Sequence, residues 1–337
     1  MERPGGERLG DGIYEAEQES YSEWTGPEAG HEPEAISSQE DKGRMQWWEA
    51  AILGLVQGVA EFLPISSTAH LLVVRYLLGH AHPEDAFTVV IQLGSMIAVV
   101  GYFRRDLVRL IGGSWEVLRR GGRHLSPDGR WALLVGIGTI PAALVGFFGH
   151  SWLKSHAFAL PVVAVVSVVF AVLMGMAEWW SAYRGRSGRT ARTEQDLNWC
   201  DALWIGCWQA CALMPGGSRS GTTITGGLLF GLHRAAATRF SFVLALPIVL
   251  LAGLKEIWEE YQRWRWPLAD SPPALLISAE SWTAWLVGLL VCTIVSYGTI
   301  WFLLHFVRRN SLWVFVVYRL GFGILLLAVW ALGWLAP

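Results

Sequence analysis

The sequence predicts an all-α, polytopic membrane protein built from two inverted-topology repeats, each with one re-entrant helical hairpin and three transmembrane helices. Composition is the first reason: 53% of the residues are hydrophobic and only 16% are charged, whereas soluble domains carry about 25% charged residues. Several apolar runs also reach the roughly 20 residues that cross a bilayer. Finally, two further apolar regions, one in each half of the chain, are interrupted by proline and serine.

The first 44 residues differ in composition from the rest of the chain. They hold twelve Asp or Glu and four Lys or Arg, a net charge of −8, and no apolar run. Residues 45–337 carry a net charge of +6. Low hydrophobicity with high net charge is typical of disorder. We therefore expect a disordered acidic tail over 1–44 and an integral membrane domain over 45–337.

Six apolar runs are expected to cross the membrane as single helices, and two broken regions are expected to enter it and turn back. Non-helical backbone at membrane depth survives only where protein or a water-filled cavity surrounds it. The broken regions, 47–79 and 201–232, are too polar in the middle for a simple span. The six expected spans are 87–103, 131–149, 160–180, 237–257, 283–307 and 311–334.

Basic residues predict the orientation of the spans. Arginines concentrate in the connections 104–130 and 181–200 and in the pair Arg308 and Arg309 after the fifth span. Cytoplasmic loops are enriched in Lys and Arg. With this number of spans, all three groups can be cytoplasmic, and both termini are then expected outside.

The two halves resemble each other in the order of their features. Gly54 to Gln57, followed by Pro64 and Ser66, parallels Gly206 to Gln209, followed by Pro215 and Ser218. This places repeat one at about 46–180 and repeat two at about 201–335, with an odd number of spans between the hairpins. Transporter folds built from inverted repeats place their binding site at the repeat interface, near the bilayer midplane.

The first break offers a nucleophile and an acidic group. Pro64 ends a helix, and Ser66 or Ser67 can cap the next one, whose free N–H groups favour a phosphate. Ser67 and His70 are three residues apart, so both can face one side of that helix. A hydroxyl beside an imidazole is the pattern of an activated nucleophile. Glu61, four residues after Gln57, could act as a base or bind Mg²⁺ or Ca²⁺.

The second break offers an anion clamp. Gly216 and Gly217 allow close approach of the backbone, and Arg219 can grip phosphate oxygens with two parallel hydrogen bonds. The neighbouring hydroxyl groups belong to Ser218, Ser220, Thr222 and Thr223.

Less specific interpretations exist for most of these residues. Single hydroxyls in membrane helices often bond their own backbone, and an arginine can extend to a lipid headgroup. His70 alone is equally compatible with an interfacial histidine. Five other charged or titratable residues are interpreted as interfacial or flanking and are left out of the site: Arg75, Glu178, His233, Arg234 and Arg239.

At these two breaks the sequence resembles the bacitracin-resistance family of undecaprenyl-diphosphate phosphatases. The family signatures are Glu/Gln-x-x-x-Glu leading into Pro-x-Ser-Ser-Thr-x-His, and Pro-Gly-x-Ser-Arg-Ser-x-x-Thr; both occur here, and the resemblance covers about residues 46–335. It implies hydrolysis of a C55 isoprenyl diphosphate to the monophosphate, which is reused in cell-wall synthesis.

The resemblance also implies roles for individual residues. Glu61 matches the acidic residue of metal binding and catalysis, Ser67 the candidate nucleophile, and His70 its acid/base neighbour. The phosphate-binding segment is matched by Ser218, Arg219 and Thr223, and Arg219 is counted with the catalytic residues. The expected metal ligands are Glu61 and Gln57. Because position 57 is Gln where many members have Glu, the metal site has one carboxylate fewer here. The expected substrate contacts are Ser66, Thr68, Gly216, Gly217, Ser218, Ser220 and Thr223.

The expected partners are a polyprenyl diphosphate lipid, the bilayer and a divalent cation, Mg²⁺ or Ca²⁺, without nucleic acid. A bacterial inner-membrane location is expected, and a homodimer is left open. The alternative function is a polyprenyl-phosphate transporter or flippase, since inverted repeats with re-entrant hairpins are common there. Direct attack by water, with Ser67 only binding phosphate, is a second mechanism.

Overall fold

The computed structural model describes residues 45–79, 86–121, 124–157, 159–265 and 279–333. Within these ranges the regular structure is helical, apart from one isolated bridge between Arg192 and Leu232. The predicted all-α class is confirmed for this part of the chain. The acidic segment 1–44 lies outside the described residues.

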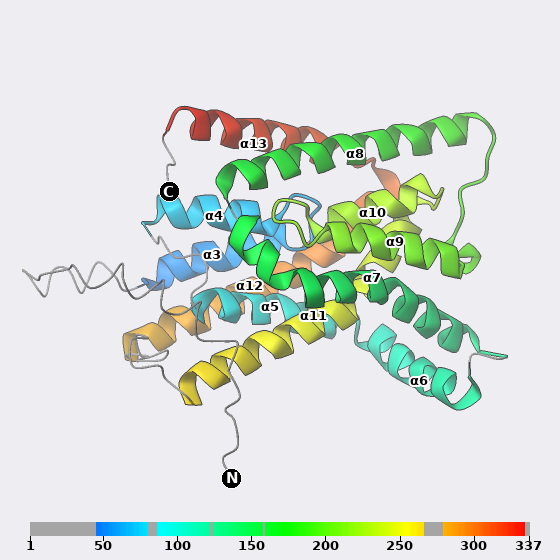
Figure 1. Ribbon diagram of the computed structural model, residues 1–337, viewed down its shortest axis with the longest axis horizontal. Coiled ribbons are helices and arrows are strands. Elements are labelled where there is room, and N and C mark those ends of the chain that lie inside the picture. Colours follow the sequence, from blue (N-terminus) through cyan, green and yellow to red (C-terminus); the bar gives the residue numbers. More distant parts are fainter. Residues whose placement is uncertain (1–44, 80–85, 122–123, 158, 266–278, 334–337) are drawn as a thin grey trace, which may run out of the picture. The chain divides into compact units, whose positions relative to one another are not determined.

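Five helices are long and apolar enough to cross a membrane (Figure 1). These are α7 (Pro127–His156), α8 (Leu160–Arg186), α11 (Arg234–Arg265), α12 (Ala279–Arg309) and α13 (Trp313–Ala331). The remaining expected span, 87–103, corresponds to α5 (Ala86–Tyr102). A 77° bend separates α5 from the next helix, α6 (Arg104–Arg120).

Helix α6 is a correction to the sequence interpretation, which took 104–130 as a basic connection. Val108, Ile111, Trp115 and Leu118 recur at helical spacing and all are exposed. Arginines at both ends of the helix hide this period in a simple count of charge. The segment is therefore an amphipathic helix, of the kind that lies along a membrane surface.

Both predicted breaks occur between pairs of short helices. The first separates α3 (Trp47–Ala60) from α4 (Ser67–Leu77), and the second separates α9 (Trp199–Cys211) from α10 (Arg219–Leu229). In each pair the two helices contact each other. Figure 1 shows α3 and α4 in one half of the view and α9 and α10 in the other, with the two connecting turns toward the middle.

The two pairs pack in matching ways on the opposite half of the chain. Helix α3 runs along α12, and α9 runs along α7. A Cβ placed on Gly54 of α3 would lie 2.6 Å from the carbonyl oxygen of Gly288, and one placed on Gly206 of α9 would lie 2.3 Å from that of Gly138. Glycine thus permits close helix packing at corresponding positions of both halves.

Replacement of Gly206 tests this packing. We expect Gly206→Ala to destabilise the protein by about 1–3 kcal/mol, because the new methyl group meets backbone that must shift. Thermal unfolding in detergent measures the effect. Gly136→Ala on α7, where a Cβ meets nothing within 4 Å, is the matched control and should not lower the unfolding temperature. Equal behaviour of the two variants would contradict the close packing.

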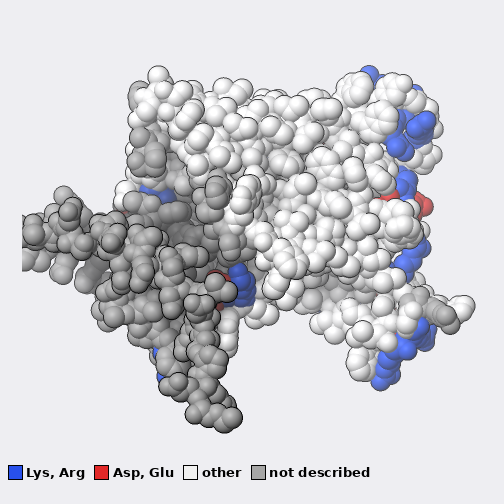
Figure 2. Space-filling view, in the orientation of Figure 1, with Lys and Arg blue, Asp and Glu red and all other residues white. Residues whose placement is uncertain are grey.

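One end of the helices collects the arginines. Figure 2 shows Lys and Arg gathered there, over α6 and the end of α8, beside a wide band without charged residues. Three arginines hold polar segments at this end through ion pairs: Arg234 Nε lies 2.7 Å from Glu178, Arg239 bridges Asp106 and Glu194, and Arg192 pairs with Asp201.

These pairs add specific partners to Glu178, interpreted as interfacial, and to Arg234 and Arg239, interpreted as flanking residues. Glu178 is fully buried. A buried carboxylate needs an opposite charge, and Arg234, on a different helix, supplies it. The arginines therefore tie α8, α11 and the connection before α9 together.

Candidate active site

A cavity of about 980 Å³ contains residues from both breaks. From the first break, Gln57, Glu61, Ser66, Ser67 and Thr68 line it. From the second, Met214, Pro215, Gly216, Ser218 and Arg219 line it. Two segments about 150 residues apart in the sequence therefore form one cavity.

A polar cluster centred on Glu61 joins the two breaks. Arg219 Nη2 lies 3.3 Å from Glu61 Oε1, and the Ser67 hydroxyl donates to Glu61 Oε2 at 2.9 Å. The Gln57 amide donates to the same oxygen at 3.3 Å. The other terminal nitrogen of Arg219, Nη1, is buried and has no hydrogen-bond partner among the described residues. A buried donor of this kind is costly unless a ligand satisfies it.

Side-chain bonds to the backbone hold the second break against the first. Ser218 caps α10 by accepting from the Gly221 N–H at 3.3 Å, and the Ser220 hydroxyl donates to the Leu63 carbonyl at 3.1 Å. Gly216 has a φ of +92°, and a Cβ there would lie 2.3 Å from the Val163 carbonyl oxygen. The turn before Arg219 therefore requires glycine at this position for two reasons.

The two helix starts share an uncommon backbone conformation. Ser66 before α4 has φ 77° and ψ 100°, and Ser218 before α10 has φ 65° and ψ 109°. A side-chain-bearing residue at positive φ costs about 1–3 kcal/mol and persists where its surroundings enforce it. Such strain concentrates at functional sites, and here it orients both helix N-termini.

His70 faces a different neighbour from the one its spacing suggested. Its Nδ1 lies 2.7 Å from the Ser66 carbonyl oxygen, its Nε2 lies 2.6 Å from the Tyr318 hydroxyl, and its ring stacks on Phe322 at 4.2 Å. A carbonyl only accepts, so Nδ1 carries a proton, and in the neutral imidazole Nε2 then accepts from the Tyr318 hydroxyl. The expected pairing of Ser67 with His70 is replaced by Ser67 with Glu61, because Ser67 begins α4 and reaches back to α3.

Removal of the Tyr318 hydroxyl tests how His70 is held. We expect Tyr318→Phe to keep the ring stack and to lower phosphate release about fivefold, since one neutral hydrogen bond contributes about 1 kcal/mol. Steady-state assays in detergent measure this effect. Phe322→Tyr adds a hydroxyl to the neighbouring ring and serves as the control. Activity of Tyr318→Phe equal to that of the unsubstituted protein would show that this contact is not needed.

Arg319 is a buried residue that sequence reasoning missed. It is fully buried on α13, and its Nη2 donates to the carbonyl groups of Gly216 and Gly217 at 2.8 and 3.0 Å. The signal was present, because an arginine inside an apolar span marks a functional position. Arg319 does not line the cavity, and it fixes the glycine turn through these two carbonyl groups.

Several predicted substrate contacts support the site from behind its surface. Gly217, Ser220 and Thr223 are not among the residues that line the cavity, and neither is His70, which was predicted to be catalytic. Thr223 is fully buried, donates to the Arg219 carbonyl at 2.7 Å and contacts the Ser241 hydroxyl. Their direct contact with substrate stays a prediction.

Arg75 lies in the cavity wall, although the sequence suggested an interfacial position. Its side chain is buried on α4 and lines the cavity. Lys255 and Glu259 of α11, paired at 3.1 Å, line the same cavity. Helical spacing alone identifies the face that Arg75 occupies but not the partner helix that covers it.

The rest of the cavity wall is apolar. Leu93 of α5, Ala142 of α7 and Ile248 of α11 line it, as do Phe147 and Leu251, which are exposed on the outside of the helices. A molecule with a polar head and a hydrocarbon tail fits this division into a charged centre and apolar walls.

Oxygen atoms suited to a hard cation are few. Glu61 supplies a carboxylate, and the buried Gln57 Oε1 has no partner among the described residues. Carboxylate and amide oxygens suit Mg²⁺ and Ca²⁺. Within the described ranges, no group of three or more His, Cys, Asp or Glu lies together. These residues fit a cation that takes its other ligands from substrate or water.

Fold and site together define a polytopic helical membrane protein with a cavity that combines a charged centre and apolar walls. Residues 50–325 match the family model described as bacitracin resistance protein BacA. The chain belongs to this family, which confirms the resemblance seen in the sequence.

Curated relatives support the assignment over nearly their whole length. An undecaprenyl-diphosphatase of Synechococcus sp. (strain JA-3-3Ab) is 41% identical over 86% of this chain and 97% of its own. An undecaprenyl-diphosphatase of Prosthecochloris aestuarii is 39% identical over 86% of this chain and 99% of its own. One of Chlorobaculum tepidum is 37% identical over 87% of this chain and all of its own.

Proposed function

We propose that this protein hydrolyses undecaprenyl diphosphate to undecaprenyl phosphate and inorganic phosphate. The observation that carries the proposal is the Ser67 hydroxyl bonded to Glu61 beside Arg219, whose Nη1 has no partner in the part of the chain that the structure describes. The activity named for the relatives supports it. Hydrolysis returns the lipid carrier to cell-wall synthesis and accounts for bacitracin resistance.

The reaction follows from the residues of the cavity. Arg219 and the N-termini of α4 and α10 stabilise the charge of the diphosphate. Ser67 Oγ attacks the terminal phosphorus while Glu61 takes its proton, and the bond from that phosphorus to the bridging oxygen breaks. Undecaprenyl phosphate leaves. Water then attacks the phosphoserine, and Ser67 regains a proton, which releases inorganic phosphate.

Positioning and charge stabilisation supply most of the catalysis in phosphoryl transfer. In the free protein, Arg219 pairs with Glu61. Binding of a diphosphate draws the guanidinium toward phosphate oxygens, which leaves the carboxylate free to accept the serine proton. His70 holds the start of α4 through the Ser66 carbonyl, and its role as acid or base stays a prediction.

Release of inorganic phosphate by the purified protein in detergent tests this function. A transporter or flippase, the alternative, moves lipid between compartments, and detergent removes the compartments. Phosphate release above the level of an Arg219→Ala preparation supports hydrolysis, and its absence contradicts the proposal. The relatives described above, each named an undecaprenyl-diphosphatase, favour hydrolysis over transport.

A divalent cation, Mg²⁺ or Ca²⁺, is the cofactor that we propose, held by Glu61 and Gln57 Oε1. It would supply additional positive charge to the diphosphate. We expect a chelator to abolish most phosphate release and either cation to restore it. Gln57→Glu adds a second carboxylate one helical turn from Glu61 and should tighten cation binding by about tenfold in calorimetry. Full activity in chelator would contradict a metal requirement.

The membrane arrangement is also part of this proposal. We infer re-entrant α3–α4 and α9–α10 hairpins within inverted repeats, supported by the matched packing of α3 on α12 and α9 on α7. We infer a bacterial inner-membrane location in which the arginine-rich end faces the cytoplasm by the positive-inside rule. The start of α3 and the end of α13 then lie outside. A homodimer stays a prediction.

A further inference from the structure

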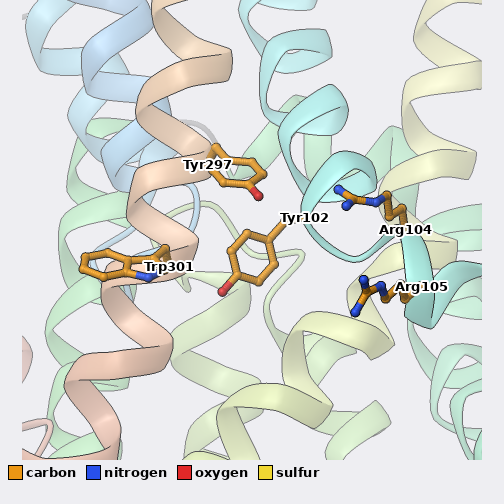
Figure 3. A pocket seen from close by; sticks show the side chains of 5 residues that line it. All are labelled: Tyr102, Arg104, Arg105, Tyr297 and Trp301. Atoms are coloured by element: carbon orange, nitrogen blue, oxygen red, sulfur yellow. The ribbon is translucent and has the colours of Figure 1, made fainter.

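A second cavity, of about 350 Å³, lies at the bend between α5 and α6. Tyr102, Arg104 and Arg105 line it from the bend, and Tyr297 and Trp301 line it from α12. Figure 3 shows both arginine side chains extending from the start of α6 toward the aromatic side chains. None of these five residues lines the cavity that contains Glu61 and Arg219.

The positive charge of this second cavity is not compensated by neighbouring acids. Among the described residues, Arg105 makes no hydrogen bond or ion pair, and Arg104 donates only to the Gly101 carbonyl at 3.3 Å. The adjacent carboxylate, Asp106, is paired with Arg239 at 3.2 Å. The N-terminus of α6 carries no side-chain cap and adds the positive end of a helix dipole.

The surroundings place this cavity at a boundary between lipid and water. Helix α6 exposes its apolar stripe of Val108, Ile111, Trp115 and Leu118, each at least 57% exposed. Trp301 and Tyr297 are 54% and 46% exposed on a membrane-spanning helix. Tyr and Trp are enriched where the bilayer meets water.

We propose that this cavity binds the headgroup of an anionic phospholipid. Arg104 and Arg105 bind its phosphate, the Tyr and Trp side chains provide polar tips around it, and the acyl chains lie on the exposed apolar surface beside the cavity. Basic pockets between membrane helices bind anionic headgroups in this way. A lipid fits better than free phosphate, because the arginines sit beside exposed apolar surface and not in a polar loop.

Native mass spectrometry of the full-length protein in detergent tests the proposal. Short-chain phosphatidylglycerol, short-chain phosphatidylcholine and inorganic phosphate are the three probes. The variant Arg104→Gln/Arg105→Gln is compared with Arg119→Gln/Arg120→Gln, which removes the same charge from the other end of α6. We expect the first variant alone to weaken phosphatidylglycerol binding, on the order of 20- to 30-fold for two arginine contacts.

Each other outcome counts against the proposal. Equal losses in both double variants, or no loss in either, would mean that the cavity is not the binding site. Equal binding of phosphatidylcholine would remove the requirement for negative charge, and displacement by millimolar inorganic phosphate would assign the site to a free anion. Should the double variant fail to fold, Arg105→Gln alone gives the same comparison, since its guanidinium bonds no described residue. Phosphate release should remain unchanged in all of these variants.

Discussion

Arg219→Ala should lower kcat/KM for phosphate release on the order of 10³-fold, because an arginine that stabilises a transferring phosphoryl group contributes 10³-fold or more. Its side chain is the only guanidinium hydrogen-bonded to Glu61 among the described residues, and it keeps one buried donor without a partner. Arg219→Lys retains the charge but loses the planar pair of donors, so we expect it to recover only part of the loss.

Two comparisons separate this result from a general effect of losing an arginine. Arg109→Ala removes an exposed arginine on α6 and should retain full activity. Thermal unfolding of Arg219→Ala should remain cooperative, since Ser218 and Ser220 still hold the turn. Turnover of a folded Arg219→Ala protein within threefold of the unsubstituted protein would contradict the clamp.

The second large effect is expected for the pair Glu61 and Ser67. Glu61→Gln keeps the shape of the side chain but loses the base, and we expect a loss of about 10²- to 10⁴-fold in kcat. Ser67→Ala removes the nucleophile and should cost at least as much. Because the two groups act through one hydrogen bond of 2.9 Å, the double variant should be no worse than the more damaged single variant.

Comparison of the two single variants with the double variant also decides between attack by Ser67 and direct attack by water. If water attacks phosphorus directly, Ser67→Ala loses only about tenfold, the value of one phosphate contact, and its effect adds to that of Glu61→Gln. A labelled phosphoenzyme trapped at short times should then be absent from every variant. The control is Glu49→Gln, which changes a carboxylate at the other end of α3. This variant should remain active in all of these assays.

The breaks and the residues at their tips were predictable because their signals are local. Pro64 and Pro215 end helices wherever they stand, and a polar run inside an apolar chain requires a protein environment. A site formed by both breaks was predicted from the matching order of features in the two halves, because inverted repeats place a binding site at their interface. Neither inference needs knowledge of distant contacts.

The environment of His70 was not predictable because its partner is 248 residues away. Spacing along α4 indicates which face His70 shares, but not whether α3 or α13 covers that face. Arg75 and Glu178 illustrate the same limit, since burial depends on the helices packed above them. Arg319 was missed for a different reason: the mean hydropathy of its span concealed a charge that by itself indicates function.

Photocrosslinking tests the central claim most directly. A polyprenyl diphosphate analogue with a photoreactive group beside the phosphates is bound to the purified protein, irradiated, and mapped by peptide sequencing. The account predicts label on both the 61–70 and the 214–223 segments, each competed by unlabelled diphosphate lipid. Label confined to one segment, or found on neither, would contradict a single site shared by the two broken helices.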